Sequence, residues 1–298
     1  MRILVYGQRL KESDTKYVEE LFQALVRHKI DVWIYAPFRD DVQKMISLPE
    51  SFPPFNGTED FGQIPIDIVI TLGGDGTILS AITLIKDHTI PIMGINLGRL
   101  GFLAAIEKKI ITQAISELAE GNYRIEDRSM LSLETDEPSL FVNERFALND
   151  FTLHKRDTSS MITIHTFIDG QFLNSYWADG VILSTPTGST GYSLSCGGPI
   201  IHPGSGNFVI TPVAPHNLTV RPIVISDSHV VSFQIEGRTE NFLATLDSRF
   251  ESVTADHQIS LSKCNFPARL VLLDSFSFLR TIREKLAWGK DMRNSYVE

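Results

Sequence analysis

The feature that most constrains the fold is an apolar, β-branched run that leads directly into a cluster of glycines. Residues 66–72 read IDIVITL, a composition typical of a strand that is buried on both faces. Gly73-Gly74-Asp75-Gly76 comes next, and a helical pattern follows over residues 77–86. A strand that enters a helix through a glycine turn indicates an α/β fold with parallel strands.

The first 125 residues repeat this alternation. Strand patterns at residues 3–6, 32–35 and 92–95 alternate with helical patterns at residues 16–29 and 110–120. Residues 49–65 are rich in proline, glycine and acids, which indicates a loop. We therefore predict an α/β domain over residues 1–125, with helices on both faces of a parallel sheet.

The pattern changes near residue 130, where short alternating segments begin. Residues 161–168 and 171–177 alternate on either side of Asp169-Gly170, which is a strong hairpin signal. Further strand patterns follow at residues 208–211, 223–225, 230–235, 242–246, 259–261 and 270–273. We predict a mostly β domain over residues 126–272, followed by an amphipathic stretch at residues 278–286.

Composition excludes several classes of protein. The chain has 298 residues, 43% hydrophobic and 21% charged, which is enough to bury a large core in one or two domains. Its net charge of -9 argues against nucleic-acid and polybasic membrane binding. No apolar run approaches the ~20 residues that span a bilayer, and Cys196 and Cys264 lack the spacing of a zinc site or a disulfide framework. We predict a cytoplasmic protein.

The glycine cluster lies at the carboxyl end of a predicted parallel strand, where ligands bind in open α/β sheets. Its glycines would let backbone amides approach a phosphate at a helix start. The Asp75 carboxylate could accept a proton from a hydroxyl or hold Mg²⁺. The alternative is a tight turn in which the acid caps the helix. Neither a P-loop nor a GxGxxG fingerprint is present.

Two more motifs could bind a ligand. A strand at residues 181–184 runs into Thr185-Pro-Thr-Gly-Ser-Thr-Gly191, whose hydroxyls and exposed amides could bind ribose and phosphate oxygens. The alternative is a Ser/Thr-rich surface loop. Asn149-Asp150 is the other motif, because an Asn side chain matches the N6/N7 edge of adenine. The alternative for this pair is a turn between strands.

Together and in this order, these motifs resemble the NAD kinase family, in its bacterial type. They are GGDG at residues 73–76, Asn149-Asp150, TPTGSTGYS at residues 185–193 and GGP at residues 197–199. The stretches at residues 96–103 and 210–223 are also similar to that family. The resemblance implies a phosphofructokinase-like α/β N-terminal domain and a mostly β, sandwich-like C-terminal domain. It also implies that residues 273–298 return to the first domain.

The resemblance implies a kinase that moves a phosphate from ATP, or from polyphosphate, to the 2′-hydroxyl of the adenosine ribose of NAD, giving NADP. Mg²⁺ or another divalent cation would assist, with unknown ligands. Asp75 would be the general base, and Gly73, Gly74 and Gly76 the phosphate loop. The implied NAD-binding residues are Asp75, Gly76, Asn149, Asp150, Asp179, Thr187, Thr190, Gly191, Tyr192, Ser193, Leu194 and Ser195. A homodimer or homotetramer is implied, with NAD and ATP as its small-molecule partners.

The sequence departs from the family pattern at three places, one of which is Leu246-Asp247-Ser248, where many members have Asp-Gly-Gln. Gly191 stands where Ala is usual, and Asp150 stands where Glu is commoner. Two other functions stay open: a kinase of another alcohol, lipid or sugar, that shares the GGDG loop, or a non-catalytic dinucleotide-binding protein. The Asn149-Asp150 pair and the block at residues 187–192 argue against the first. The intact Asp75 argues against the second.

Overall fold

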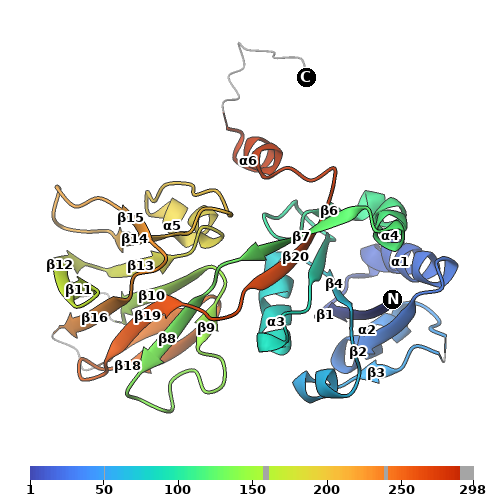
Figure 1. The fold of residues 1–298 in the computed structure, drawn as a ribbon, viewed down its shortest axis with the longest axis horizontal. Coiled ribbons are helices and arrows are strands. Elements are labelled where there is room, and N and C mark those ends of the chain that lie inside the picture. The colour runs from blue at the N-terminus through green and yellow to red at the C-terminus, as the bar shows by residue number, and fades with distance from the viewer. Residues whose placement is uncertain (50, 157–160, 238–240, 289–298) are drawn as a thin grey trace, which may run out of the picture. The chain divides into compact units, whose positions relative to one another are not determined.

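The computed structural model describes residues 1–49, 51–156, 161–237 and 241–288 (Figure 1). It divides into two compact units. The first comprises Met1–Glu126 together with the chain from Arg269 onward, and the second comprises Asp127–Ala268. The second unit is therefore an insertion in the sequence of the first. Residues 289–298, which the resemblance assigns to the first domain, lie outside the described part of the chain.

The first unit is built on a sheet in the order β3-β2-β1-β4-β5-β20-β7, with β6 paired to β5. The pairs β1–β2, β1–β4, β2–β3, β4–β5, β5–β6 and β5–β20 are all parallel. The parallel sheet was predicted for β1, β2, β4 and β5, whereas β20, predicted as a strand of the mostly β half, lies in this sheet instead. The strands are β1 (Arg2–Gly7), β2 (Asp31–Tyr35), β3 (Pro54–Phe55), β4 (Ile68–Leu72), β5 (Ile92–Asn96), β6 (Ile106–Glu107), β7 (Tyr123–Arg128) and β20 (Ala268–Leu273).

Helices connect these strands, as the α/β alternation predicts. They are α1 (Thr15–Arg27), α2 (Ala36–Met45), α3 (Asp75–Ile85), α4 (Ile111–Glu120) and α6 (Phe278–Leu286), with 3-10 turns η1 (Glu12–Asp14), η2 (Thr58–Gly62), η3 (Lys86–His88) and η4 (Lys108–Ile110). Helix α2 was not predicted, and only Phe38 and Val42 are buried in it. Two apolar positions four residues apart are too short a pattern to reveal a helix.

The second unit consists mainly of two antiparallel sheets, in the orders β15-β14-β13-β10-β17-β18 and β12-β11-β16-β19-β8-β9. Their strands are β8 (Leu131–Thr135), β9 (Phe146–Ala147), β10 (Asp150–Lys155), β11 (Ile162–Ile168), β12 (Gln171–Ala178), β13 (Gly180–Ser184), β14 (Asn207–Val213), β15 (Ile223–Ser226), β16 (Val231–Glu236), β17 (Phe242–Leu246), β18 (Arg249–Val253) and β19 (Ile259–Lys263). The chain between β13 and β14 forms η5 (Gly188–Thr190) and α5 (Tyr192–Ser195).

The two sheets share one core, which gives the second unit its sandwich-like character. Phe151 on β10 stacks on Phe233 on β16, with ring centroids 6.0 Å apart. The predicted hairpin joins β11 and β12, and Asp169 and Gly170 both have positive φ, at 49° and 77°, as a tight hairpin turn requires. Among the described residues, no helix combines the length and the apolar character needed to cross a membrane.

Candidate functional site

In the first unit, β4 ends at Leu72 and α3 begins at Asp75, so the GGDG motif forms the turn between them. Gly73 donates its N–H to the carbonyl of Ile95 at 3.0 Å. A Cβ at Gly73 would lie 2.1 Å from Thr77 Oγ1. Glycine is therefore required at this position by packing alone.

Gly74 and Gly76 are different, because a Cβ at either position would meet no atom within 4 Å. Gly74 is the N-cap of α3. The unit's own packing does not explain these two glycines. They leave open space at a helix N-terminus, where the free amides and the helix dipole favour an anion. The turn thus fits the predicted phosphate loop.

The Asp75 carboxylate is held by a loop of the same unit. Its Oδ2 accepts the N–H of Phe102 at 2.9 Å, and its Oδ1 accepts those of Leu103 at 3.1 Å and Ala104 at 2.9 Å. Packing around the carboxylate is close, since a Cβ at Gly101 would lie 1.9 Å from Asp75 Oδ1. The alternative that Asp75 caps its own helix is wrong, because Gly74 is the N-cap.

A cation also approaches this carboxylate. Lys285 on α6 places Nζ 3.7 Å from Asp75 Oδ2 and 4.4 Å from the centroid of the Phe102 ring. The Asp75 side chain keeps 29% of its surface exposed. A carboxylate has about four lone-pair positions, and the loop amides occupy three. One acceptor position remains for a hydroxyl or a metal ion.

In the second unit, the backbone of Asn149 is fixed by the turn that follows β13. Its carbonyl accepts the N–H of Thr185 at 2.9 Å, and a Cβ at Gly188 would lie 2.1 Å from the same oxygen. The Asn149 side-chain amide makes no hydrogen bond to any residue in the described part of the chain. Its donor and acceptor are therefore available to a ligand.

The tip of the β17–β18 hairpin supplies a carboxylate to which the sequence analysis gave no role. Asp247 accepts the N–H of Leu148 at 2.9 Å, that of Asn149 at 2.7 Å and that of Asp150 at 3.3 Å. Asp247 has φ of 53° and returns its own N–H to the carbonyl of Asp150 at 3.0 Å. These four bonds fix the strip of backbone that carries Asn149 and Asp150.

Asp150 and Asp247 form an acidic pair, in which Asp150 is buried and Asp247 is half-buried. Asp150 is 8% exposed, and burial followed by the charge of Asp247 raises its pKa to about 7. Burial also raises the pKa of Asp247, against the opposing effect of its amide donors. Since a second buried negative charge is costly, Asp150 exchanges its proton near neutral pH.

Arg249 on β18 holds the chain just before this strip. Its Nη1 donates to the carbonyl of Glu144 at 2.5 Å, and its Nη2 donates to the carbonyl of Phe146. The guanidinium also lies over the Phe146 ring, 5.4 Å from its centroid. The β17–β18 hairpin therefore holds the backbone of residues 144–150 through two side chains, the Asp247 carboxylate and the Arg249 guanidinium.

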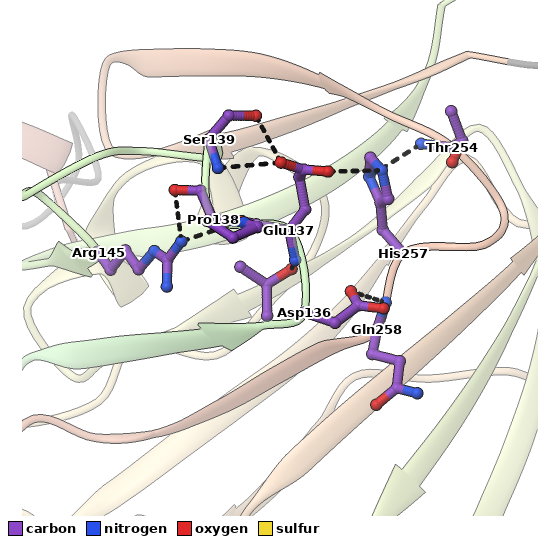
Figure 2. Close-up of polar contacts among 9 residues, drawn as sticks. Asp136, Glu137, Pro138, Ser139, Arg145, Thr254, His257 and Gln258 are labelled. Atoms are coloured by element: carbon purple, nitrogen blue, oxygen red, sulfur yellow. Dashed lines mark hydrogen bonds and ion pairs between the residues drawn. The ribbon is translucent and has the colours of Figure 1, made fainter.

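The loop between β8 and β9 is ordered by a separate polar cluster (Figure 2). Glu137 accepts two hydrogen bonds from Ser139, from N at 3.0 Å and from Oγ at 2.7 Å, and these lower the pKa of Glu137. Arg145 donates to the carbonyls of Glu137 and Pro138, each at 2.9 Å. His257 Nε2 lies 4.0 Å from Glu137 Oε2. These side chains hold the loop that leads to β9.

In the Ser/Thr block after β13, several hydroxyls point into the unit and form hydrogen bonds there. Thr185 Oγ1 donates to the carbonyl of Leu148 at 2.6 Å, and Ser193 Oγ lies 2.8 Å from Thr211 Oγ1. Arg128 Nη1 donates to Thr187 Oγ1 at 3.4 Å. The block is buried at Thr185, Thr187, Ser189 and Ser193. The alternative of a Ser/Thr-rich surface loop is wrong here, because these side chains lie inside the unit.

The remaining predicted NAD-binding residues of this block reach its surface. Gly191, Tyr192 and Ser195 are exposed, whereas Thr190 and Leu194 are half-buried. The Tyr192 hydroxyl lies 3.1 Å from His154 Nε2, and the two rings stack with centroids 6.4 Å apart. Tyr192 thus offers a partly exposed ring whose orientation is fixed by a neighbour.

Asp179, the last predicted NAD-binding acid, is paired with a cation that the sequence analysis missed. Lys155 Nζ lies 2.5 Å from Asp179 Oδ1, with side-chain exposures of 18% and 31%. The pair follows from strand geometry, because the Lys155 N–H also donates to the Asp179 carbonyl at 2.9 Å. A ligand that bonds to Asp179 would meet this lysine as well.

The predicted residues therefore form two groups, one in each unit. Asp75 and the glycine turn belong to the first unit, and all the others belong to the second. Within the described ranges, no three His, Cys, Asp or Glu side chains gather into a group that could hold a metal ion. Mg²⁺ is commonly bound through one or two carboxylates together with substrate phosphates, and Asp75 in a phosphate-compatible turn fits that mode.

Comparison with known proteins gives matches over both halves of the chain. Residues 3–123 match the model of the ATP-NAD kinase N-terminal domain, and residues 148–273 match that of the ATP-NAD kinase C-terminal domain. An NAD kinase of Cytophaga hutchinsonii is 48% identical over 295 residues, covering 99% of this chain and 100% of the relative. An NAD kinase of Bacteroides fragilis is 38% identical over 297 residues, covering 98% of this chain and 100% of the relative.

Two solved structures are similar in fold. A yeast NADH kinase complexed with NADH superposes with a TM-score of 0.87 at 24% identity, covering 99% of this chain and 90% of the other. An NAD kinase from Archaeoglobus fulgidus in complex with ATP gives a TM-score of 0.74 at 25% identity, covering 96% and 99%.

Proposed function

The chain belongs to the ATP-NAD kinase family, and we propose that it transfers a phosphate from ATP to the 2′-hydroxyl of the adenosine ribose of NAD, giving NADP. It is a phosphotransferase with an alcohol acceptor. The observation that carries the detailed proposal is Asp75, whose carboxylate is fixed by three amides with one acceptor position left. It stands in a turn whose open glycines suit phosphates.

Asp75 would act on the acceptor hydroxyl. Its free acceptor position would take the hydrogen bond of the ribose 2′-hydroxyl and orient that oxygen towards the phosphorus. The new P–O bond forms as the bond from phosphorus to the leaving oxygen of ATP breaks, and the hydroxyl proton passes to the carboxylate. Phosphoryl transfer depends chiefly on positioning and charge stabilisation, so a weak base held in place suffices.

Asn149 and Asp150 would hold the adenosine part of NAD. The Asn149 amide has no hydrogen-bond partner in the described ranges and can pair with the N6/N7 edge of adenine. The Asp150 carboxylate, in its ionised form, can accept a ribose hydroxyl. Asp247 keeps the backbone of both residues in place. The exposed ring of Tyr192 is suited to stack on a base.

Gly74 and Gly76 would bring backbone amides to the phosphates. Mg²⁺ or another divalent cation, when bound with the nucleotide, would neutralise charge on the transferred phosphate. Asp75 is the carboxylate of this turn that could contact it. The use of polyphosphate in place of ATP, the cytoplasmic location and the homodimer or homotetramer remain predictions. The relatives and solved structures reported above are NAD or NADH kinases, which favours the proposed reaction over the two alternatives, a kinase of another alcohol or a non-catalytic module.

The proposal is tested by measuring NADP formation from NAD, ATP and Mg²⁺ with an NADP-specific coupling dehydrogenase. Asp75→Asn should lower kcat by about 10²- to 10⁴-fold while changing the KM for NAD only slightly. Asp41→Asn, on α2 and paired with Lys44, is the matched control and should keep wild-type activity. A wild-type protein that is inactive with ATP and with polyphosphate would refute the proposed reaction. Equal losses in kcat and NAD affinity would refute the role of Asp75.

A further inference from the structure

A cation-rich cavity in the first unit lies beside the Asp75 contact. Its volume is about 590 Å³, and its charged lining residues are Arg99, Lys108, Lys109, Lys285, Glu107 and Glu284. Lys285 Nζ lies 3.7 Å from Asp75 Oδ2. The Lys285 side chain therefore both lines the cavity and contacts the predicted catalytic carboxylate. Four cations against two acids is an unusual concentration in a chain whose net charge is -9.

The four cations are engaged to different degrees. Lys108 Nζ lies 3.6 Å from Asp14 Oδ1, and Lys285 faces Asp75. Arg99 and Lys109 are exposed and make no ion pair with a residue in the described part of the chain. Unpaired cations that line a concave wall attract anionic ligands and focus their field there. Arg99 and Lys109 are therefore the two groups free to bind one.

The backbone around the cavity is fixed by hydrogen bonds. A helix dipole adds to the positive potential of the four cations. Asn96 donates its side-chain amide to the carbonyl of Arg99, and its Oδ1 accepts the N–H of Gly98 at 2.7 Å. The loop that carries Arg99 is thereby anchored at the end of β5. Lys108 and Lys109 belong to η4, the 3-10 turn that leads into α4, and the N-terminal end of α4 adds positive potential.

The lining residues also define which part of a ligand is recognised. None of them is aromatic, so the cavity offers no ring on which a base could stack. Several cations along one wall suit a chain of phosphates, which spreads its negative charge over its length. Guanidinium and ammonium groups are the side chains that bind phosphate oxygens most strongly.

We propose that this cavity binds the polyphosphate tail of the phosphoryl donor through Arg99 and Lys109, and that Lys285 passes from Asp75 to the tail when the donor binds. The inference rests on the proposed function and deepens it. Movement of the Lys285 ammonium to a phosphate oxygen withdraws a positive charge from Asp75, which leaves that carboxylate to the acceptor hydroxyl. Donor binding then frees the Asp75 carboxylate to act as the general base. The nucleobase of the donor contributes little to the choice of donor.

The test compares wild type with Lys109→Ala, Arg99→Ala and the double variant. Steady-state kinetics with ATP and NAD should show the KM for ATP raised about ten-fold in the double variant, since charge-assisted bonds to phosphate are lost. The KM for NAD should stay within about two-fold, because no NAD contact is altered. Inorganic tripolyphosphate, titrated calorimetrically against the full chain, should lose affinity by a similar factor. Lys44→Ala on α2 is the control and should change neither quantity.

Both substituted side chains are exposed, so the variants should fold, which the thermal unfolding midpoint checks. Charge reversal in Lys109→Glu provides a second variant and should have a larger effect. An unchanged KM for ATP together with unchanged tripolyphosphate binding in the double variant would overturn the inference. A third outcome separates the two proposals. If the wild type makes no NADP, but binds tripolyphosphate more tightly than the double variant does, the anion site is supported and the proposed reaction is refuted.

Discussion

The Asp247 carboxylate accepts the backbone N–H of Asn149 at 2.7 Å, although the two residues are 98 positions apart. The same carboxylate also holds the N–H groups of Leu148 and Asp150. A hairpin tip therefore determines where the predicted adenine-binding residue lies. Because the charge of Asp247 also raises the pKa of Asp150, Asp247 influences both the geometry and the charge of that strip.

Asp247→Asn should reduce stability and NAD affinity together. An amide side chain has one acceptor oxygen in place of two, so at least one buried N–H is left without a partner, at a cost of about 1–3 kcal/mol in the free energy of unfolding. The KM for NAD should rise because the strip that carries Asn149 loosens. Urea unfolding and kinetics measure these effects, with the adjacent Ser248→Ala as control. A variant with wild-type stability would contradict the clamp.

The Asp150 proton should make stability depend on pH. Burial and the charge of Asp247 raise its pKa from 3.8 to about 7, so the folded chain holds a proton that the unfolded chain releases. The stabilisation is therefore complete below pH 3.8 and is lost as pH rises through about 7. Between pH 5 and pH 8 the wild type should lose about 2–3 kcal/mol relative to Asp150→Asn.

This comparison is made by urea unfolding of both proteins across the same pH range, because other titrating groups then cancel. A stability difference that stays constant from pH 5 to pH 8 would show that Asp150 titrates well outside this window. The NAD affinity of the wild type should increase over the same range, since the ionised carboxylate is the acceptor for a ribose hydroxyl. Asp150→Asn should lack that increase.

Gly73→Ala and Gly76→Ala should fail in different ways. A methyl group at Gly73 would collide with Thr77 Oγ1, and the backbone there has φ of 155°. Its thermal midpoint should therefore fall, at a cost of about 1–3 kcal/mol. A methyl group at Gly76 meets no protein atom, so the fold should persist while phosphate approach and turnover suffer. Equal thermal midpoints for the two variants would contradict this assignment.

Tyr192→Ala should weaken NAD binding more than Tyr192→Phe. The phenylalanine variant keeps the ring and loses only the contact between the hydroxyl and His154. Stacking of a base on an aromatic ring contributes about 1–3 kcal/mol, so the KM for NAD should rise about ten-fold in Tyr192→Ala. Similar effects in both variants would place the contribution in the hydroxyl rather than in the ring.

Local patterns predicted the parts of the fold that local physics determines. The buried run before Gly73, the glycine turn and the Asp169-Gly170 hairpin all follow from short stretches of sequence. The strand β7 was missed because its sequence YRIEDR is mostly polar and only Arg128 in it is buried, so it looks like a polar linker. Its place in the sheet depends on pairing with β20, which comes some 140 residues later.

The supporting residues of the site could not be predicted because their roles arise from distant contacts. Asp247 occupies an ordinary two-residue hairpin tip, and Lys285 lies on an amphipathic helix near the end of the chain. Nothing in either stretch indicates which carboxylate or amide it will meet. The burial of Thr185 and Ser193 was missed for the same reason, since Leu148 lies between β9 and β10 and Thr211 lies on β14, both distant in the sequence.

The order of the strands in the first sheet has a consequence for synthesis on the ribosome. β20 lies between β5 and β7 in that sheet, yet it is translated only after the whole of residues 127–268. The inserted unit can therefore complete its two sheets while the sheet begun first still lacks an internal strand. Until residue 273 emerges, β7 lacks its neighbour in the sheet, and β5 is paired on that side only with the short strand β6, which leaves unpaired backbone edges. Chaperone protection during translation should matter most for this early, unfinished half.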